Sequence, residues 1–250
     1  MSYLRAGYRL VALIAVQIIF TLLGFILFIL FSRSKKKHWT CIALFMGYWA
    51  RCCCFILNIH VKVSGEEKPS GKTLIVSNHV GLSDIFILGS CFGPMFVSKR
   101  DVSHWPLVGW MVRLGGAVFV DRSKRHQVPE MISMIAERLE MGFAVALFPE
   151  GGVTDGKQVG AFKSSSFEAA VKSRATVVPA MIRYHDDNNP SVAFWGGTTF
   201  LNHIVRLLKN PRLDATLTLL PSIREGKDRR VIAKHCEEMI GKAYMDQTKK

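Results

Sequence analysis

The sequence predicts an α/β protein, in which a mixed sheet flanked by helices follows a pair of apolar amino-terminal helices. Two observations carry this prediction. From residue 59 onward, short β-rich runs alternate with segments of helical pattern, which is typical of a sheet with helices on its faces. Before residue 59, the chain is dominated by two long apolar stretches.

Several short runs are expected as strands and several longer segments as helices. The expected strands are residues 59–63, 73–77, 94–98, 117–120, 144–148, 176–184, 191–195 and 215–220. The expected helices are residues 84–91, 128–141, 164–172, 200–208 and 228–244. Residues 74–76 and 145–147 are continuously apolar, as expected of strands that are buried on both faces. Pro179 lies inside another expected strand, which favours an edge position or a bulge there.

Residues 10–31 form a run of 22 residues without a charged side chain. As a helix this run is about 33 Å long, enough to cross a hydrocarbon core of about 30 Å. A cleavable signal peptide has a shorter apolar region, and here the basic segment 32–37 follows. We therefore predict an uncleaved membrane anchor with a span at about residues 10–31, and a buried core helix is the alternative. Two basic residues precede the run and four follow it, which favours a cytoplasmic location for the rest of the chain.

The second apolar stretch, residues 40–59, contains Arg51 near its middle. A charge at the centre of a span costs about 2.5–3.5 kcal/mol on insertion scales. We therefore expect an interfacial helix at about residues 40–58, with the Arg51 side chain reaching the membrane surface. The chain is thus expected to divide into a membrane anchor, residues 1–64, and a globular domain, residues 65–250.

The charge of the chain points to a membrane surface. The formal net charge is +14 and the mean hydropathy is +0.21, which leaves nucleic acid and anionic membranes as partners. The first 65 residues hold eight basic side chains and no acidic one. The other 185 hold 25 basic and 19 acidic side chains, without the interleaved aromatic and basic residues expected of a nucleic-acid-binding sheet. We therefore expect membrane lipids as partners and no nucleic acid. A non-enzymatic basic protein that binds lipid or nucleic acid is the alternative class.

His79 and Asp84 form the first candidate site. His79 follows an apolar strand and Asp84 falls in the first turn of the next expected helix, at the strand end where α/β sheets bind ligands. Asp84 could bind one imidazole nitrogen and leave the other as a base for a hydroxyl group. The alternative is that Ser83 or Asp84 only caps the helix.

The second candidate site is the loop after the apolar run 144–148. Glu150 and three glycines follow within a few residues, and such a loop can bring backbone N–H groups close to an anion. Residues 151–157 have the glycine and lysine spacing of a phosphate-binding loop, but Gln158 stands where Ser or Thr would hold magnesium. Lys99 and Arg122 each follow an expected strand, where they could hold a phosphate or simply face solvent. The tryptophan-containing stretch 105–110 is expected to line an apolar groove or contact lipid, and packing in the core is the alternative.

Four sequence blocks, in this order, resemble those of the glycerolipid acyltransferase family. The matching residues are His79 and Asp84; Gly116, Phe119 and Arg122; Phe148 to Gly151; and Val177 to Pro179. The resemblance covers about residues 59–225, and the preceding apolar helix pair is similar as well.

The resemblance implies transfer of a fatty acyl group from a thioester of coenzyme A or acyl carrier protein to a lysolipid hydroxyl. An acceptor such as 1-acyl-glycerol-3-phosphate would place the reaction in phospholipid biosynthesis. It implies His79 as the base and Asp84 as its partner, with Arg122 and Glu150 at the acceptor site and no metal or bound cofactor. No Gly-x-Ser-x-Gly elbow is present, which argues against an acyl-serine intermediate. A thioester or lipid hydrolase is a further alternative.

The continuation of the third block departs from the lysophosphatidic acid enzymes. Many of these continue with Thr-Arg, whereas Gly152 and Val153 follow Gly151 here. This continuation is similar to family branches that acylate lyso-ornithine lipid or lysophosphatidylcholine-type lipids. Lys163 could replace the missing charge, or it could be a surface lysine.

Overall fold

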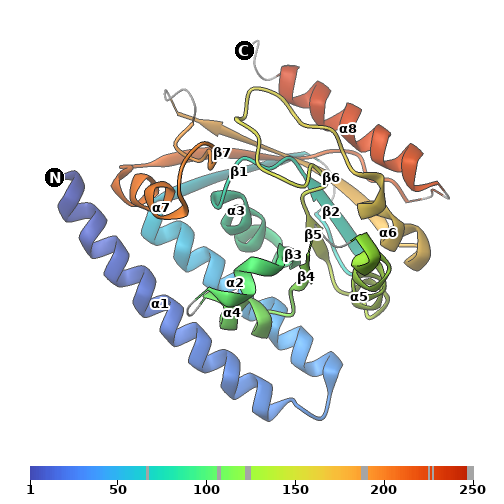
Figure 1. The fold of residues 1–250 in the computed structure, drawn as a ribbon, viewed down its shortest axis with the longest axis horizontal. Coiled ribbons are helices and arrows are strands. Elements are labelled where there is room, and N and C mark those ends of the chain that lie inside the picture. Colours follow the sequence, from blue (N-terminus) through green and yellow to red (C-terminus); the bar gives the residue numbers. More distant parts are fainter. Residues whose placement is uncertain are drawn as a thin grey trace.

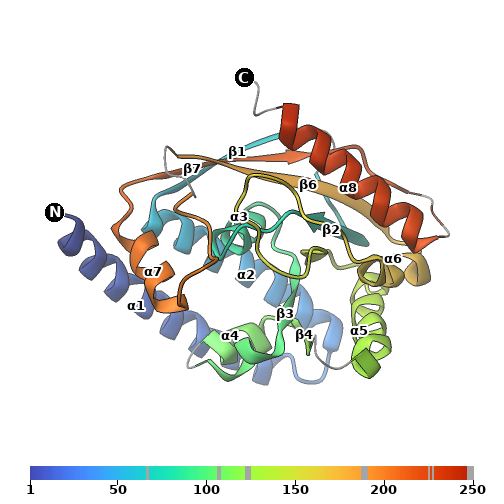
Figure 2. The same ribbon diagram turned by 45° about the horizontal axis from the view of Figure 1, so that its top comes forward.

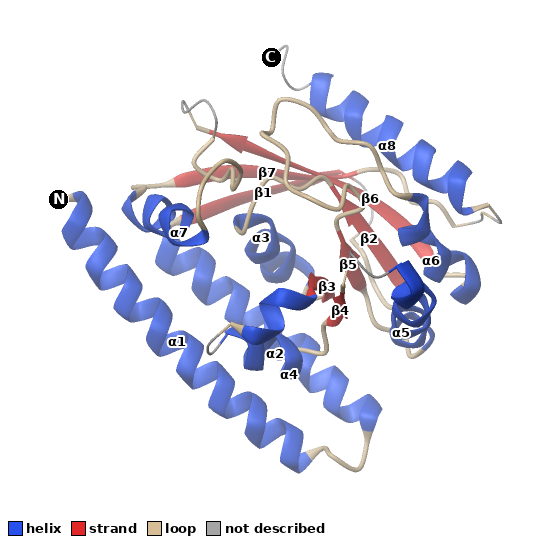
Figure 3. Cartoon of the chain, viewed as in Figure 1, coloured by secondary structure: helices blue, strands red, loops and turns tan. Residues whose placement is uncertain are grey.

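The structure, a computed structural model, describes residues 1–65, 68–105, 108–121, 125–186, 191–224, 226 and 228–246. Its seven-stranded sheet is mixed, as the sequence predicts, with the strand order β1-β7-β6-β2-β5-β3-β4 (Figure 3). The β6–β7 pair is antiparallel and the other pairs are parallel. The strands are β1 (Ile59–Gly65), β2 (Thr73–Ser77), β3 (Met95–Lys99), β4 (Val118–Val120), β5 (Val145–Leu147), β6 (Thr176–His185) and β7 (Leu213–Leu219).

Helices cover both faces of the sheet (Figure 1). One face carries α1 (Ser2–Leu30), α2 (Lys35–Leu57), α3 (Ser83–Phe92), α4 (Val108–Leu114) and α7 (Phe200–Lys209). The other face carries α5 (Val128–Glu140), α6 (Glu168–Ser173) and α8 (Arg229–Asp246). Short 3-10 helices occupy Arg100–His104, Arg125–Gln127 and Ser164–Phe167. On β2, Ile75 packs toward the first face while Leu74 and Val76 pack toward the second, so the predicted apolar run is buried on both sides.

Helix α2 packs into the first face of the sheet. Ten of its 23 residues are buried, and Ala50 is among them. A Cβ added to Gly89 of α3 would lie only 2.7 Å from the Cβ of Ala50, so small residues allow this close helix approach. Arg51 is exposed and its Nε donates to the Ser90 carbonyl at 3.0 Å. Asn58 then ends the helix in the left-handed conformation, and β1 begins at the next residue.

Helix α1 lies along one side of the molecule (Figures 1 and 2). Near its start, Arg9 is buried and donates to the carbonyl oxygens of residue 208, at the end of α7, and of residues 210 and 211, just after it. Past its end, Lys35 forms an ion pair with Glu137 of α5. Its outer side remains apolar and exposed from Leu4 to Leu30. Among the described residues, α1 and α2 are the two helices long and apolar enough to cross a membrane.

Three local predictions are wrong or only partly right. Residues 191–195 form no strand, because this segment packs over the loop after β2, where Trp195 N donates to the Val80 carbonyl at 3.0 Å. The helix expected at 164–172 divides into a 3-10 turn and α6. Helix α4 was not predicted; its Trp110 is 55% exposed.

Pro179 lies in an internal strand, so the edge alternative is wrong and the bulge is correct. Strand β6 pairs with β2 on one side and β7 on the other. Ala180 pairs with Leu219, and Val177 pairs with Ile223. The segment that follows β7 therefore has one residue more between these two pairs than β6 has. The ladder is therefore interrupted opposite Pro179, where its missing N–H costs no regular hydrogen bond.

Candidate functional site

The loop between β2 and α3 brings His79 and Asp84 together. The side chain of Asn78, itself buried, donates to the Ile182 carbonyl at 2.9 Å and accepts from Ile182 N at 2.8 Å, which fixes the chain to β6. The next residue, His79, places its Nδ1 2.7 Å from Oδ2 of Asp84. The Asp84 side chain is fully buried, whereas 16% of the His79 side chain is exposed.

Asp84 accepts hydrogen bonds at both carboxylate oxygens. Besides the imidazole, Oδ2 accepts the backbone N–H groups of Val80 at 2.7 Å and Gly81 at 2.9 Å. Oδ1 accepts the Tyr184 hydroxyl at 2.5 Å. Burial, followed by the charge of Asp84, raises the pKa of Tyr184, so the phenol stays protonated and donates. Asp84 therefore closes the turn before α3 through Val80 and Gly81 and binds the imidazole as well. Helix α3 itself has no side-chain cap hydrogen bond, so the capping alternative is wrong.

This arrangement leaves Nε2 of His79 as the nitrogen that can accept a proton. Because Asp84 is buried and accepts from four donors, its negative charge is stabilised and its orientation is fixed. The Nδ1 proton then points at Asp84, and the lone pair of Nε2 faces outward. An imidazole held in this way is a general base for a hydroxyl group.

The loop after β5 holds the imidazole from the other side. The Phe148 ring stacks on His79 with centroids 4.0 Å apart and planes 11° from parallel. The N–H of Thr154 donates to the His79 carbonyl at 2.8 Å, and His79 N donates to Oε1 of Glu150 at 2.9 Å. The two candidate loops predicted from the sequence therefore form one site.

Glu150 binds backbone groups. Its Oε2 accepts a hydrogen bond from Gly160 N at 3.2 Å, and its Oε1 accepts one from His79 N. Glu150 thus connects the loop after β2 with a later part of its own loop. Burial raises its pKa to about 6, and the two N–H donors oppose that shift. In this structure Glu150 therefore positions the main chain at His79.

Comparison with known proteins identifies the family. Residues 60–183 match the family model described as Acyltransferase. The chain is 32% identical to a lyso-ornithine lipid O-acyltransferase of Pseudomonas aeruginosa, over 77% of this chain and 75% of the relative. The chain belongs to the acyltransferase family.

A further relative supports the assignment, and a solved structure shows the same fold. A 1-acyl-sn-glycerol-3-phosphate acyltransferase of Neisseria gonorrhoeae is 28% identical, over 85% of this chain and 83% of that protein. The crystal structure of the 1-acyl-sn-glycerophosphate acyltransferase PlsC from Thermotoga maritima shares the fold, with a TM-score of 0.73 at 20% identity. The structural match covers 100% of this chain and 99% of the PlsC chain. The family resemblance predicted from the four sequence blocks is thus confirmed.

The substrate-binding residues predicted for this acyltransferase lie in different places. Gly151 has φ +77°, and a Cβ there would lie 2.5 Å from Nζ of Lys163, so glycine lets the lysine lie against this loop. Lys99 lies at the exposed end of β3, two strands from β2, and pairs with Asp101. Arg122 lies outside the described residues.

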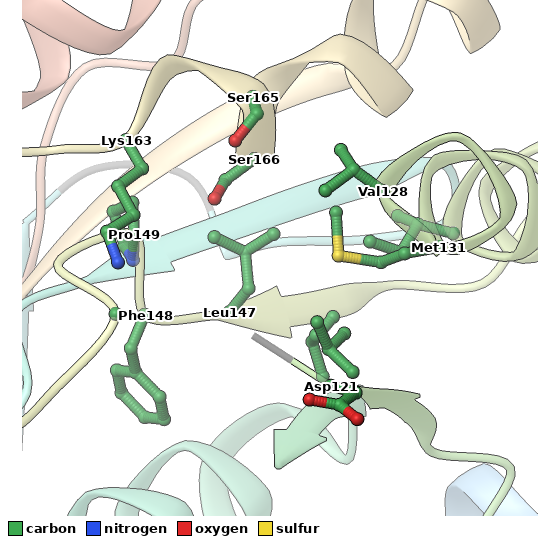
Figure 4. Close-up of a pocket in the computed structure, with 13 residues that line it drawn as sticks. Asp121, Val128, Met131, Leu147, Phe148, Pro149, Lys163, Ser165 and Ser166 are labelled. Carbon is green, nitrogen blue, oxygen red and sulfur yellow. The ribbon is translucent and has the colours of Figure 1, made fainter. Parts of the chain in front are cut away.

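A pocket of about 140 Å³ opens beside the loop after β5 (Figure 4). Its walls are mainly apolar side chains of β3, β4, β5 and α5, such as Leu147 and Met131. Its charged and hydroxyl side chains are Asp121, Lys163, Ser165 and Ser166. An apolar pocket with a few polar groups is typical of sites for amphiphilic ligands. Within the described part of the chain, no group of three or more His, Cys, Asp or Glu side chains could hold a metal ion.

Tyr184 and Asn78 are the site residues that sequence reasoning missed. Both act between strands that are far apart in the chain, since β2 pairs with β6. The only available signal was that each lies near the carboxyl end of an expected strand. That signal does not say which strands are neighbours, so the contact between Tyr184 and Asp84 could not be derived.

Proposed function

We propose that this protein transfers a fatty acyl group from a thioester to the free hydroxyl of a lysolipid. The observation that carries the proposal is the pair of His79 with the buried Asp84, which leaves Nε2 of His79 as a partly exposed base. Similarity to enzymes named for acylating 1-acyl-glycerol-3-phosphate and lyso-ornithine lipid supports the acceptor class.

In the proposed reaction, Nε2 of His79 takes the proton of the acceptor hydroxyl as its oxygen attacks the thioester carbonyl. Asp84 stabilises the imidazolium that forms. When the tetrahedral intermediate collapses, the carbon–sulfur bond breaks and the imidazolium returns the proton to the leaving thiolate. The products are an ester and a free thiol, and His79 is neutral again. No metal and no bound cofactor takes part, and coenzyme A or acyl carrier protein carries the acyl group.

The acceptor headgroup is proposed to lie beside Gly151 and Lys163. The ammonium group of Lys163 lies next to the loop after β5, where a Cβ at Gly151 would lie 2.5 Å from its Nζ. A cation at this point can bind a phosphate or carboxylate of the lysolipid. Arg122 and Lys99 remain further proposed contacts, by resemblance and by position at a strand end. Gly152 and Val153, where many lysophosphatidic acid enzymes have Thr-Arg, favour a lyso-ornithine-type acceptor as the second candidate.

We propose that the amino-terminal helices hold the protein on the cytoplasmic face of a membrane. Near its start, helix α1 is bound to the end of α7 through Arg9, and it packs along α2 and α4 while its outer side stays apolar and exposed. This arrangement supports a helix that lies in the membrane surface. Cysteines placed at residues 2 and 34 should then react from the same side of sealed vesicles. A transmembrane span of residues 10–31, which the length and apolar character of α1 allow, is the alternative.

The test uses the full-length protein in detergent with labelled acyl-coenzyme A or acyl carrier protein. We expect release of free thiol, and formation of labelled diacyl product, only when a lysolipid is added. Lysophosphatidic acid and lyso-ornithine lipid are offered separately to identify the acceptor. Thiol release without any lysolipid would instead establish a hydrolase. Absence of product with every donor and acceptor would contradict the proposed function.

A further inference from the structure

A second and larger cavity lies at the opposite end of the parallel strands from His79. It has a volume of about 560 Å³ and lies between the turn that joins α1 to α2, helix α4 and the end of α5. Gly116 and Ala117, which line it, precede β4, and Arg138 lies in the last turn of α5, which leads back to β5. The cavity is therefore at the amino ends of these strands, whereas His79 follows the carboxyl end of β2. We call it the hairpin cavity.

The hairpin cavity is basic. Its described lining includes Lys35, His38, Arg113 and Arg138 and contains no Asp or Glu. Arg138 is 8% exposed, and its hydrogen bonds go to the carbonyl oxygens of Gly116 at 2.8 Å and Met134 at 2.7 Å. The neighbouring carboxylate of Glu137 pairs with Lys35 on the outside. Arg138 therefore makes its hydrogen bonds to neutral carbonyl oxygens, and the carboxylate that stabilises its charge, Glu137, is shared with Lys35. The cations of the cavity outnumber the carboxylates beside them, so the cavity attracts an anion.

The other walls of the hairpin cavity are aromatic. Phe25 and Phe28 come from α1, Trp39 from α2 and Trp110 from α4. The Arg138 guanidinium lies 4.8 Å from the centroid of Trp39, and Arg113 lies 5.7 Å from that of Trp110. The cations are thus held over aromatic faces. His38 adds a buried Nδ1 without a hydrogen-bond partner among the described residues.

This combination matches one class of ligand. Aromatic rings beside Lys and Arg characterise protein surfaces at the level of lipid headgroups. The cavity adjoins the exposed apolar side of α1, where Ile26 and Ile29 are at least half exposed, so acyl chains could continue along the helix. We propose that the hairpin cavity binds an anionic phospholipid, with its phosphate at Arg113 and Arg138 and its acyl chains along α1. This site is separate from the His79 site and holds a bilayer lipid that is not a substrate.

The experiment measures binding of brominated phosphatidylglycerol to the detergent-solubilised full-length protein, by quenching of tryptophan fluorescence. Trp39 and Trp110 line the cavity and therefore report directly on a bromine there. Brominated phosphatidylcholine is the neutral comparison. We expect saturable quenching by phosphatidylglycerol with an apparent affinity at least about tenfold higher than for phosphatidylcholine, and weakening with added salt.

The double variant Lys35→Gln/Arg113→Gln removes two exposed cations from the cavity. We expect it to weaken phosphatidylglycerol binding at least about tenfold and to leave phosphatidylcholine binding within about twofold. The control is the double variant Arg230→Gln/Lys242→Gln, which removes two positive charges from α8 on the other face of the sheet. It should change the binding of neither lipid. Acyl transfer in detergent and far-ultraviolet circular dichroism confirm that each variant is folded.

Three results would overturn the proposal. Equal binding of the two lipids by the unmodified protein would remove the anionic selectivity, without need of any variant. An equal loss in both double variants would show a general charge effect. Displacement of the brominated lipid by millimolar glycerol 3-phosphate would identify a site for free phosphate groups instead of lipid.

Discussion

The carboxyl and amino ends of the parallel strands differ in how they handle buried charge. At the carboxyl ends, the carboxylate of Asp84 is buried and accepts from four donors, and it holds His79. At the amino ends, Arg138 is buried with only carbonyl partners among its hydrogen bonds, next to other cations. In the first region the buried charge is saturated by protein donors, whereas in the second the cations outnumber the carboxylates beside them. A saturated network suits a group whose orientation must not change during a reaction, whereas an excess of cations suits the binding of an anion that we propose.

The strongest way to break the network at the carboxyl ends is Asp84→Asn. The amide keeps the shape but loses the charge that stabilises the imidazolium. We expect kcat for acyl transfer to fall by about 10²–10⁴-fold, with KM for the lysolipid within about threefold. Asp246→Asn, at the exposed end of α8, is the matched control and should be unchanged. A variant with undiminished kcat would remove Asp84 from the mechanism.

Glu150→Gln tests the second loop of the same region through stability. Burial raises the Glu150 pKa from 4.5 to about 6, so the folded state holds this proton more tightly than the unfolded chain. Protonation of Glu150 therefore contributes about 2 kcal/mol to the free energy of unfolding. This contribution is fully present below pH 4.5 and is lost as the pH rises through about 6. We therefore measure the unfolding free energy of the wild type and of the variant from pH 4 to 7. The difference, wild type minus variant, should fall by about 2 kcal/mol over this range. A difference that does not vary with pH would contradict the shift.

Tyr184→Phe removes one of the four donors to Asp84 and keeps the ring. Without the phenol, the carboxylate binds the imidazole proton more strongly, so the acid limb of the kcat/KM profile should move to higher pH. We expect kcat to fall about tenfold. Tyr48→Phe, exposed on α2, is the control. A lower rate with an unmoved pH profile would leave Tyr184 with a purely structural role.

Lys163→Gln probes the cation that lies beside Gly151 in the loop after β5. Loss of its charge should raise KM for an anionic lysolipid about fivefold and change kcat less, because the lysine binds the headgroup in ground state and transition state alike. Lys172→Gln, exposed on α6, should have no effect. If both variants behave as wild type, the headgroup lies elsewhere.

The same two regions show what the sequence could predict. His79 and Asp84 are joined by one turn, so a local pattern was sufficient to pair them and to place them after an apolar strand. Both amino-terminal helices were likewise evident as uninterrupted apolar runs. Such features depend on neighbouring residues in the chain.

The rest depends on contacts between distant segments. Tyr184 reaches Asp84 because β6 lies beside β2, and no periodicity reports strand order. Residues 191–195 have the composition of a strand but find no partner, since they pack over Val80 and Gly81. The hairpin cavity escaped prediction for the same reason. Its cations come from three helices, and the sequence treats Lys35, Arg113 and Arg138 as unrelated surface charges.

The most direct test of the catalytic role of His79 is the rate of acyl transfer by His79→Ala. The measurement follows labelled acyl groups from the thioester into lipid at saturating lysolipid, with thermal unfolding to confirm the fold. We predict a loss of at least about 10³-fold in kcat, with the lysolipid still bound, because no other group replaces Nε2 as the base. A folded variant that retains the wild-type rate would contradict the role of His79 as that base.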